Sequence, residues 1–442
     1  MKKGKILIQC FGIFIGLLAI LWLFMILSAS IPNSFLKKNM VKSALTIART
    51  DAFANCEGDN LSGIADNYAD SIWLNVAWYM GKGNPCFSSM DTKYYDGEDK
   101  GERAGLYLAV TEENQEANTD YTRYWHGTAA VIRIFHLFTD LNGIRMIGFV
   151  VTLGLAAAVM ILLIRDGKDW AAICFFLSLC IIKIWNVRLS MEYQPAFIIG
   201  FLMCILYLLF EKKGDECLIL LSVMGGTLIT FFDFLTTETV VILLPLILVV
   251  AVRGIEHRIG SFNKSMASII VQGMGWLGAY VTTVLTKWFL ASLLTGTNKF
   301  ESALNSASER ISGNNPGTGE LGFLMQKLAA PAANLSVLFG GSERLSGLSF
   351  ILGILFLGLF VAISLGTLRF GNKENRTATK ILIILGSIII VRYLVLNNHS
   401  YIHAFFTYRG MMSMVMALFF IILLNSSAMT NHLLIGHERI NK

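Results

Sequence analysis

Two carboxylates stand four residues apart in the first long polar segment of the chain. Asp66 and Asp70 open an apolar-rich stretch that runs to Gly81. On a helix this spacing places both carboxylates on one face, where either could accept a proton as a general base. Acidic residues in a first helical turn are also favoured by the helix dipole, so a purely structural role remains an alternative. The residue types leave the choice between the two carboxylates open.

Aromatic and basic residues cluster farther along the same segment. The cluster consists of Arg123, Tyr124, Trp125 and His126. A helical pattern begins here, with polar side chains on one side, which are His126, Arg133, His136 and Asp140. The stretch after Asp66 also has an apolar stripe, formed by Ala69, Trp73, Val76 and Met80. Amphipathic segments of this kind are expected to lie on the membrane surface rather than cross the membrane.

Further ionisable residues lie near the ends of long apolar segments. Such side chains are costly to bury at membrane depth, so they are candidates for substrate binding. They are Arg188, Glu192, Asp233, Glu238, Arg392, His399, His403 and Arg409. Arg392 and Arg409 could grip a phosphate through two parallel hydrogen bonds, or could reach the membrane interface without a ligand. Asp233 and Glu238 belong to a tight hairpin, for which a solvated turn is the alternative.

His399 and His403 have the spacing at which two histidines on one helix can bind a metal ion. Asn397, Asn398 and Ser400 indicate a turn at this point. The sequence therefore predicts no metal site and no definite cofactor, and it leaves a requirement for a divalent metal open.

Composition identifies the elements that position these residues. Of the 442 residues, 55% are apolar and 15% are charged, and the mean hydropathy is +0.60. These values exclude an ordinary water-soluble domain and predict an all-α polytopic membrane protein. A spanning helix needs roughly 20 apolar residues, and about ten segments are candidates. The predicted spans are 6–28, 144–164, 170–187, 195–210, 217–235, 238–252, 266–294, 347–368, 381–397 and 404–425.

The distribution of Lys and Arg predicts the orientation of these spans. If the basic N-terminus is inside, the inside connections carry many basic residues, whereas the three short outside connections carry only Arg188. This bias follows the positive-inside rule and predicts that both termini are cytoplasmic. The net charge of +6 arises largely from these connections, so it does not indicate a nucleic-acid partner. We expect an integral protein of a bacterial cytoplasmic membrane.

Two long outer loops interrupt what we predict to be a single transmembrane domain over 1–442, with no soluble C-terminal domain. The first loop, 29–143, carries the carboxylates, the aromatic cluster and the amphipathic segments. The second loop, 296–345, is rich in Gly, Ser and Asn, most densely at 312–319, which predicts a flexible segment that is either a lid or simple slack. Cys56 and Cys86 share the first loop, and a disulfide and free thiols are equal alternatives for them.

The order of these features resembles that of the GT-C-type membrane glycosyltransferases. In the stretch 66–81, acidic residues after the first span precede a surface-lying helix and a Gly, as in the first outer loop of that family. The match continues through Tyr124 and Trp125, an amphipathic segment at 132–141, the turn at 142–143, Arg145 and the span 146–164. The resemblance covers roughly the first 165 residues and the general plan of about ten spans.

The resemblance implies an outer-face glycosyltransferase that moves a sugar from a polyprenyl-phosphate donor to a cell-envelope acceptor. Asp66 or Asp70 would be the general base, and Arg409 and Arg392 would bind the donor phosphate. The expected substrate-binding residues are Arg123, Tyr124, Trp125, His126, Asp233, Glu238, Arg188, Glu192, His399 and His403. The expected partners are the lipid-linked donor and membrane lipids. For the aromatic pair, stacking on a sugar and anchoring at the interface are equal alternatives.

A transporter or flippase for a lipid-linked substrate is the rival hypothesis. Such a protein usually has polar groups near the membrane midplane. The ionisable residues of this chain instead gather toward the predicted outer side, which favours an enzyme. A membrane scaffold is a third reading, but it would have no use for clustered Asp, Arg and His side chains.

Overall fold

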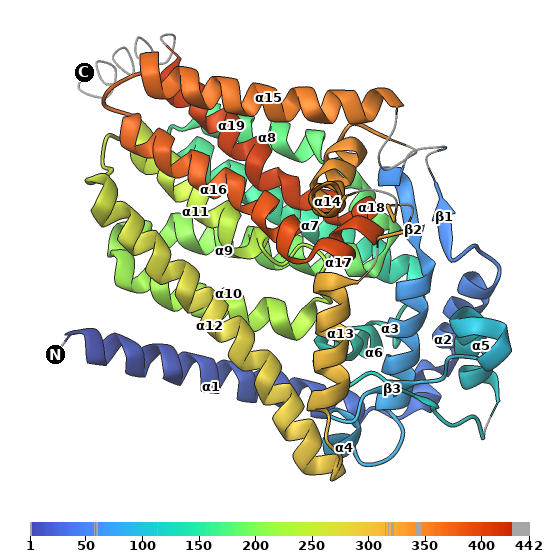
Figure 1. The fold of residues 1–442 in the computed structure, drawn as a ribbon. Helices are drawn as coiled ribbons and strands as arrows, with labels where there is room; N and C mark the ends of the chain where they lie inside the picture. Colours follow the sequence, from blue (N-terminus) through green and yellow to red (C-terminus); the bar gives the residue numbers. More distant parts are fainter. Residues whose placement is uncertain are drawn as a thin grey trace.

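The computed structural model describes residues 2–426, except 57, 59, 60, 113, 314, 317, 320, 321 and 342–346. The predicted cytoplasmic C-terminus and parts of the Gly-rich run at 312–319 therefore lie outside the described residues. Within them the chain is almost entirely helical, and the strands form two short antiparallel pairs. Long helices run across the molecule, and short helices and strands gather at one end (Figure 1). The architecture is that of an all-α membrane protein, as the composition predicts.

Eight segments of the described chain are helical, long and apolar enough to cross a membrane. Their main helices are α1 (Lys2–Ala29), α7 (Leu141–Arg165), α9 (Pro195–Phe210), α10 (Asp215–Phe232), α12 (Phe262–Thr295), α15 (Gly347–Phe370), α16 (Arg376–Val395) and α19 (Met412–Asn425). The two other predicted spans contain shorter apolar helices, α8 (Asp169–Ile181) and α11 (Val240–Ile255). All ten predicted segments therefore contain an apolar helix, and eight reach spanning length.

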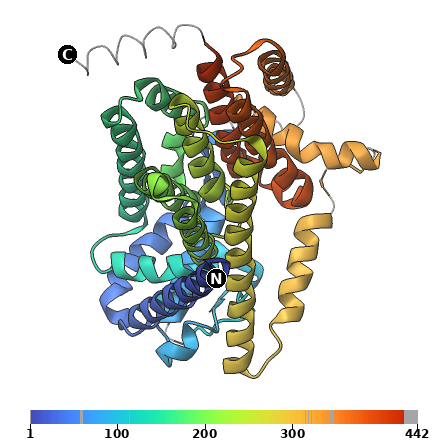
Figure 2. The same ribbon diagram turned by 90° about the vertical axis from the view of Figure 1, so that its left-hand side faces the viewer.

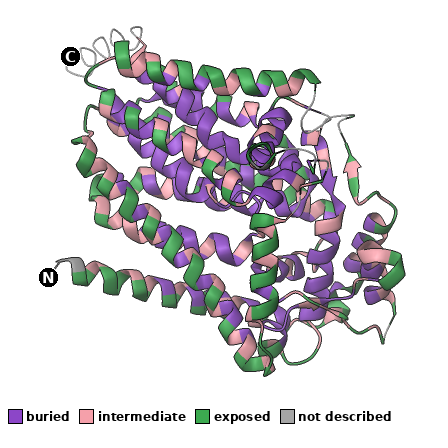
Figure 3. Cartoon of the chain, in the orientation of Figure 1, coloured by how far each residue is buried: buried purple, intermediate pink, exposed green. Residues whose placement is uncertain are grey.

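The centre of the helix bundle is α11, which is buried along nearly its whole length and packs against α9, α16 and α19. Helices α10 and α12 make a second close pair, which depends on a glycine. A Cβ at Gly226 would lie 2.2 Å from the carbonyl oxygen of Trp276, so any other residue would force the two helices apart. Helices α1 and α15 instead expose much of their apolar surface, as expected for helices that face lipid (Figure 3).

Charged connections meet at the end of the bundle away from the strands. Glu211 accepts a hydrogen bond from Arg258 at 2.6 Å, and Lys168 forms an ion pair with Glu256 at 2.8 Å. Three connections that were predicted to face the inside, after α7, α9 and α11, therefore share one end of the molecule.

The first long loop folds into a compact layer at the opposite end. Its elements are α2 (Asn33–Ala48), β1 (Phe53–Asn55), β2 (Ile64–Asp66), α3 (Asn67–Met80), α4 (Pro85–Ser88), β3 (Lys93–Tyr94), α5 (Gly101–Thr111), β4 (Thr119–Asp120) and α6 (Gly127–Phe135). Strand β1 pairs with β2, and β3 pairs with β4. The buried guanidinium of Arg133 joins the layer, because it donates to Ala77 O at 2.7 Å, Asn33 Oδ1 at 2.8 Å and Ser28 O at 3.0 Å.

Helix α3 confirms the predicted helix after Asp66, but its apolar stripe packs inside the loop layer and is not an exposed face. Every residue from Asp70 to Met80 is buried, because α2, α5 and α6 pack around the helix. Its polar side chains are satisfied inside this layer, as when Asn75 donates to Tyr95 O at 2.9 Å. Helix α6 is likewise covered on its expected polar side, where Arg133 is fully buried.

The structure also decides an alternative left open for the first loop and shows helices in the second. Cys56 and Cys86 are exposed free thiols, so they do not form a disulfide. The second loop is not a structureless connection, since it contains α13 (Phe300–Ser312) and α14 (Phe323–Leu338). Figure 2 shows these two helices along one side of the bundle, next to the C-terminal helices. Helix α14 packs on α15 and on the short helices α17 (Asn397–Ile402) and α18 (Ala404–Thr407).

Candidate functional site

Asp66 is the N-cap of α3, at the point where β2 ends. Its Oδ1 accepts a hydrogen bond from Ala69 N at 2.8 Å, and its side chain is 2% exposed. Burial raises the pKa of Asp66 to about 6, although the bonds to Ala69 N and to the carboxyl of Glu192 favour the ionised form. A carboxylate with a pKa near 6 is suited to accept a proton at neutral pH.

Asp70 has a different environment, although it lies only one turn farther along α3. Its Oδ2 accepts hydrogen bonds from Arg145 Nη2 at 2.7 Å and Nε at 2.8 Å. Its Oδ1 accepts from Ser190 Oγ at 2.7 Å and from Met191 N at 3.0 Å. These bonds fasten α3 to the start of α7 and to the 190–191 turn, so Asp70 has the surroundings of a structural carboxylate.

A cavity of about 290 Å³ lies between the loop layer and the helix bundle. We call it the polar cavity. Its wall combines carboxyl, guanidinium and imidazole groups with many aromatic rings, and it includes Asp66, Glu192, Arg123, Arg310, His399, His403, Tyr68, Tyr94, Tyr121, Tyr124, Trp73 and Phe234. Asp66 is thus part of the cavity wall, whereas Asp70 is not. Eight of the predicted site residues lie elsewhere and are described below.

Two arginines enter this cavity from segments far apart in the chain. Arg123 follows β4, and its guanidinium lies over the Tyr121 ring at 4.2 Å and the Tyr124 ring at 5.4 Å from the centroids. Arg310, on α13, lies 5.9 Å from the centroid of the same Tyr124 ring. Neither guanidinium forms an ion pair with a carboxylate of the described residues, and Arg123 Nε has no hydrogen-bond partner there. Both positive charges are therefore available to an anionic ligand.

Aromatic rings hold the two arginines in place. The rings of Tyr124 and Phe234 stack at 4.8 Å with an interplanar angle of 22°, and Tyr121 meets both rings edge to face. His126 packs against Phe234 at 4.8 Å, and its Nε2 is 2.6 Å from Tyr121 O. Burial lowers the pKa of His126 well below its usual value, so this imidazole is neutral and supports the ring cluster.

His399 fixes the position of Arg310. Its Nε2 is 2.8 Å from Leu235 O, so Nε2 carries the hydrogen, and its Nδ1 accepts from Arg310 Nη1 at 2.9 Å. Burial and nearby positive groups lower the pKa of His399 well below its usual value, which matches this neutral form. The His399 and His403 rings lie 4.7 Å apart, and His403 stacks on Phe406. The described residues contain no group of three or more His, Cys, Asp or Glu side chains that could hold a metal ion.

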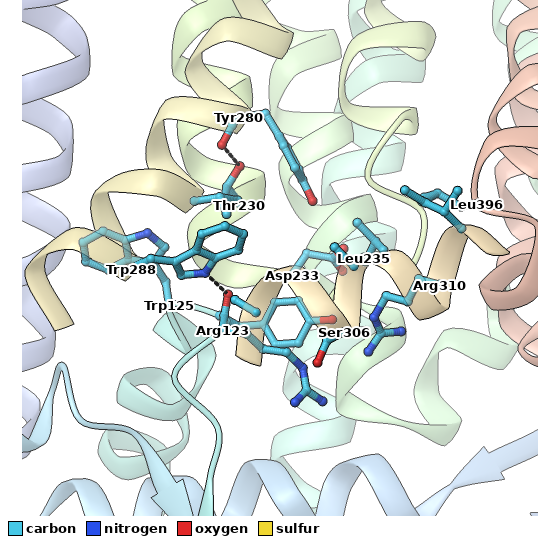
Figure 4. Close-up of a pocket in the computed structure, with 15 residues that line it drawn as sticks. Arg123, Trp125, Thr230, Asp233, Leu235, Tyr280, Trp288, Ser306, Arg310 and Leu396 are labelled. Carbon is cyan, nitrogen blue, oxygen red and sulfur yellow. Dashed lines mark hydrogen bonds between the residues drawn. The ribbon is translucent and has the colours of Figure 1, made fainter. Parts of the chain in front are cut away.

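A second cavity, of about 190 Å³, adjoins the polar cavity and is lined mainly by apolar and aromatic side chains. We call it the apolar cavity. It lies among α10, α12 and α13, and it shares Arg123, Tyr124 and Arg310 with the polar cavity. Figure 4 shows Trp125, Tyr280 and Trp288 in its wall and the guanidinium groups of Arg123 and Arg310 at its edge. The two cavities therefore meet at the cationic groups.

Two of the predicted phosphate-binding and substrate-binding residues instead bind each other. Arg392 forms a buried ion pair with Glu238, with Nη2 at 2.9 Å and Nε at 3.0 Å from the carboxylate oxygens. It also donates to Leu235 O at 2.9 Å and to Ser400 Oγ at 3.1 Å. These bonds join α16 to the hairpin after α10, and neither residue lines either cavity.

Three other predicted residues also lie apart from the polar cavity. Arg409 is 1% exposed, its guanidinium lies 4.4 Å from the Tyr193 ring centroid, and it is not part of either cavity wall. Arg188 is exposed and donates to Trp185 O at 3.4 Å. Trp125 lines only the apolar cavity, where its Nε1 donates to Thr283 O at 2.7 Å.

Asp233 also lines only the apolar cavity. Its carboxylate accepts hydrogen bonds from the backbone and the hydroxyl of Thr236, at 2.8 and 2.5 Å. Burial raises the pKa of Asp233 to about 7. Its hydrogen bonds close the hairpin after α10, but the turn is buried and not solvated as the sequence alternative had it, since Asp233 is 4% exposed.

Comparisons of the chain with protein-family models, with curated proteins and with solved structures found no match. The geometry of the two cavities is therefore the basis for any statement about function.

Some residues of the site were not predicted. Arg310 lies in the second loop, which was predicted to be flexible, although the apolar spacing of Phe300, Ala303 and Ala307 is compatible with a helix. Phe234 and Tyr280 fall within the predicted spans 217–235 and 266–294, where no sequence signal distinguishes them from lipid-facing residues. The sequence predicted the aromatic cluster around Tyr124, because aromatic and basic side chains are consecutive there.

Proposed function

We propose that the protein is a membrane glycosyltransferase that takes a sugar from a lipid-phosphate donor and transfers it to a hydroxyl acceptor. The observation that carries the proposal is the meeting of the two cavities at Arg123 and Arg310. A polar chamber with a buried carboxylate adjoins an apolar chamber, and two guanidinium groups without carboxylate partners among the described residues lie at the junction. A lipid-linked sugar has the same order of parts, namely an apolar chain, a phosphate and a polar ring.

The charge distribution fits a phosphate at this junction. Guanidinium groups bind phosphate through parallel hydrogen bonds, and such bonds are stronger away from bulk water. Arg123 and Arg310 lie on the ring of Tyr124, which holds both near one position. We therefore assign the donor phosphate to Arg123 and Arg310 in place of Arg392 and Arg409.

The aromatic wall of the polar cavity fits a sugar ring. Apolar faces of sugars stack on aromatic side chains, and Tyr68, Tyr94 and Trp73 line the cavity next to Asp66. The apolar cavity would receive the first part of the lipid chain, between α12 and α13. Trp125, Trp288 and Tyr280 line this path.

In the proposed reaction Asp66 is the general base. The acceptor hydroxyl gives its proton to the Asp66 carboxylate while its oxygen bonds to the anomeric carbon of the sugar. The bond between that carbon and the phosphate oxygen breaks, and its electron pair leaves with the phosphate. Arg123 and Arg310 stabilise the negative charge that develops on the phosphate. Asp70 holds α3 in position through Arg145 and takes no part in proton transfer.

The proposal is tested with the purified protein in lipid vesicles that contain a radiolabelled polyprenyl-phosphate sugar. Release of the label from the lipid is followed with a mixture of cell-envelope glycans as acceptor. Asp66→Asn removes the base and is expected to reduce transfer by roughly 10²- to 10⁴-fold. Asp51→Asn is the matched control, because Asp51 is an exposed carboxylate in the same loop layer.

Two results would contradict the proposal. Equal transfer by wild type and Asp66→Asn would exclude Asp66 as the base. Movement of the intact lipid-linked sugar between leaflets, without release of the sugar and with equal rates in both variants, would favour the transporter hypothesis.

A further inference from the structure

Glu192 lies directly against Asp66 in the wall of the polar cavity. It follows Ser190, whose hydroxyl accepts a hydrogen bond from Glu192 N at 3.4 Å and caps the short turn there. The carboxyl groups of Glu192 and Asp66 lie close enough to share a hydrogen bond, and the Ser190 turn brings them together, because Ser190 Oγ donates to Asp66 O at 3.5 Å. Both side chains are at least nine-tenths buried, at 5% and 2% exposure. A hydrogen bond between two carboxyl groups requires that one of them carries a proton.

The remaining oxygen atoms of the pair have distinct surroundings. One oxygen of Asp66 accepts from Ala69 N, which favours the ionised form of this residue. Glu192 Oε1 has no hydrogen-bond partner among the described residues, although the residue lines the cavity. A buried oxygen without a partner is costly to maintain unless a ligand or water uses it. The asymmetry indicates that the proton resides on Glu192 and the negative charge on Asp66.

Other charged and titratable groups act on the pair from several elements. They are Asp70 on α3, Arg145 on α7, Tyr193 beside Glu192, Asp233 after α10 and Tyr121 after β4. Asp70 is neutralised by Arg145 at 2.7 Å. Two negative charges in contact would repel each other strongly in a buried place, so the pair favours a state with one proton.

We propose that Asp66 and Glu192 form a proton-sharing pair in which the Glu192 carboxyl donates a hydrogen bond to the Asp66 carboxylate and keeps it ready to accept the acceptor proton. Glu192 is a positioning residue in this arrangement, because it acts through Asp66. The inference rests on the proposed function and adds a second carboxyl to its site.

The pair has a defined proton balance through one turnover. It begins with one proton and one negative charge. The acceptor hydroxyl transfers its proton to Asp66, so both carboxyl groups are then neutral, and the negative charge has passed to the departing phosphate. One proton must leave to solvent before the next turnover, which restores the singly charged pair.

The first test uses Glu192→Gln and Glu192→Leu in the vesicle transfer assay at different pH values. Gln can still donate to Asp66, so the acidic limb of the rate profile should stay near that of wild type. Leu cannot donate, so the limb should move to higher pH by roughly one unit, which lowers the rate at pH 6 by about fivefold. Glu112→Gln, at an exposed glutamate of the loop layer, is the control. An unmoved limb in an active Glu192→Leu variant would overturn the inference.

A second measurement does not depend on activity. Infrared spectra of the membrane-embedded protein at about pH 9 detect protonated carboxyl groups by their C=O stretch, because ordinary carboxyls are ionised there. Glu192→Gln should lose one such signal relative to wild type, and Asp66→Asn should weaken it, because the negative charge of Asp66 helps to keep the proton on Glu192. Signals from other buried carboxyls cancel in the difference. If the C=O signal changes as described but neither the wild type nor any variant transfers sugar, the proposed function is wrong and the proton-sharing pair is still supported. If Glu192→Gln loses no signal, the pair fails.

Discussion

Replacement of Asp66 by Asn should make the protein more stable at neutral pH while it removes transfer activity. Asp66 has a folded-state pKa of about 6, compared with an ordinary value of 3.8, and burial is the main cause. A carboxyl with a raised pKa favours folding when it is protonated. This contribution is complete below about pH 4 and is lost as the pH rises through about 6.

The magnitude follows from the size of the shift. About two pKa units correspond to roughly 3 kcal/mol, and the side chain is too buried for solvent to screen the charge. Asn keeps the hydrogen bond to Ala69 N, because Asn and Asp are equally good N-cap residues. We therefore expect Asp66→Asn to stabilise the folded state by about 3 kcal/mol at pH 7.5 and by nearly nothing at about pH 4.

The assay is the free energy of unfolding of the detergent-solubilised protein, measured for wild type and Asp66→Asn at several values between pH 4 and 8. Asp51→Asn serves as the control for the loss of one exposed negative charge. The reasoning is refuted if the difference between Asp66→Asn and wild type stays constant over this range, or if the variant is the less stable protein at pH 7.5.

Three other predictions concern neighbouring groups. Asp70→Asn should destabilise the fold by roughly 3 kcal/mol, since Arg145, whose side chain is only 13% exposed, would lose its charged partner. A thermal unfolding midpoint equal to that of wild type would contradict this. Arg133→Met should lower the unfolding midpoint by an amount that corresponds to several kcal/mol, because the substitution leaves carbonyl oxygens of three segments without donors. Unchanged protection of the loop layer from hydrogen exchange would contradict this prediction. Arg310→Ala should weaken binding of a short-chain polyprenyl phosphate about 10-fold or more without a change in the unfolding midpoint. Titration calorimetry measures the affinity, with Arg188→Ala as the control. Equal affinities of wild type and Arg310→Ala would show that Arg310 is not a phosphate ligand.

Long apolar runs determined the helices of the membrane part in advance. Each predicted span contains an apolar helix, because an uninterrupted run of apolar side chains has no other way to satisfy its backbone in lipid. The helix at Asn67–Met80 also followed from local signals, since Asp66 is a residue type that caps helices and an apolar stripe follows it. The turn predicted at 142–143 is wrong, because α7 begins at Leu141, where Asp140 is the N-cap.

The spacing of four residues did not determine the directions in which the side chains of Asp66 and Asp70 point. A separation of four residues puts two side chains on one face only if both residues are helical. Asp66 is the N-cap, with φ −87° and ψ 79°, so its side chain turns back over the first turn. Asp70 is inside the helix and points to Arg145, which lies on another helix. The two carboxylates therefore differ in role because one is at the boundary of the element and the other is within it.

The partners of the charged residues were decided by tertiary structure alone. Arg392 donates a hydrogen bond to Glu238, which is 154 residues away in the chain, and Arg310 donates one to His399, which is 89 residues away. A sequence shows that such charges exist and that their burial needs a partner, but any of several carboxylates could supply it. Helix packing brings one specific partner within hydrogen-bond distance. Packing thereby separates the arginines that hold the fold together from Arg123 and Arg310, which lie at the junction of the cavities with no carboxylate partner among the described residues.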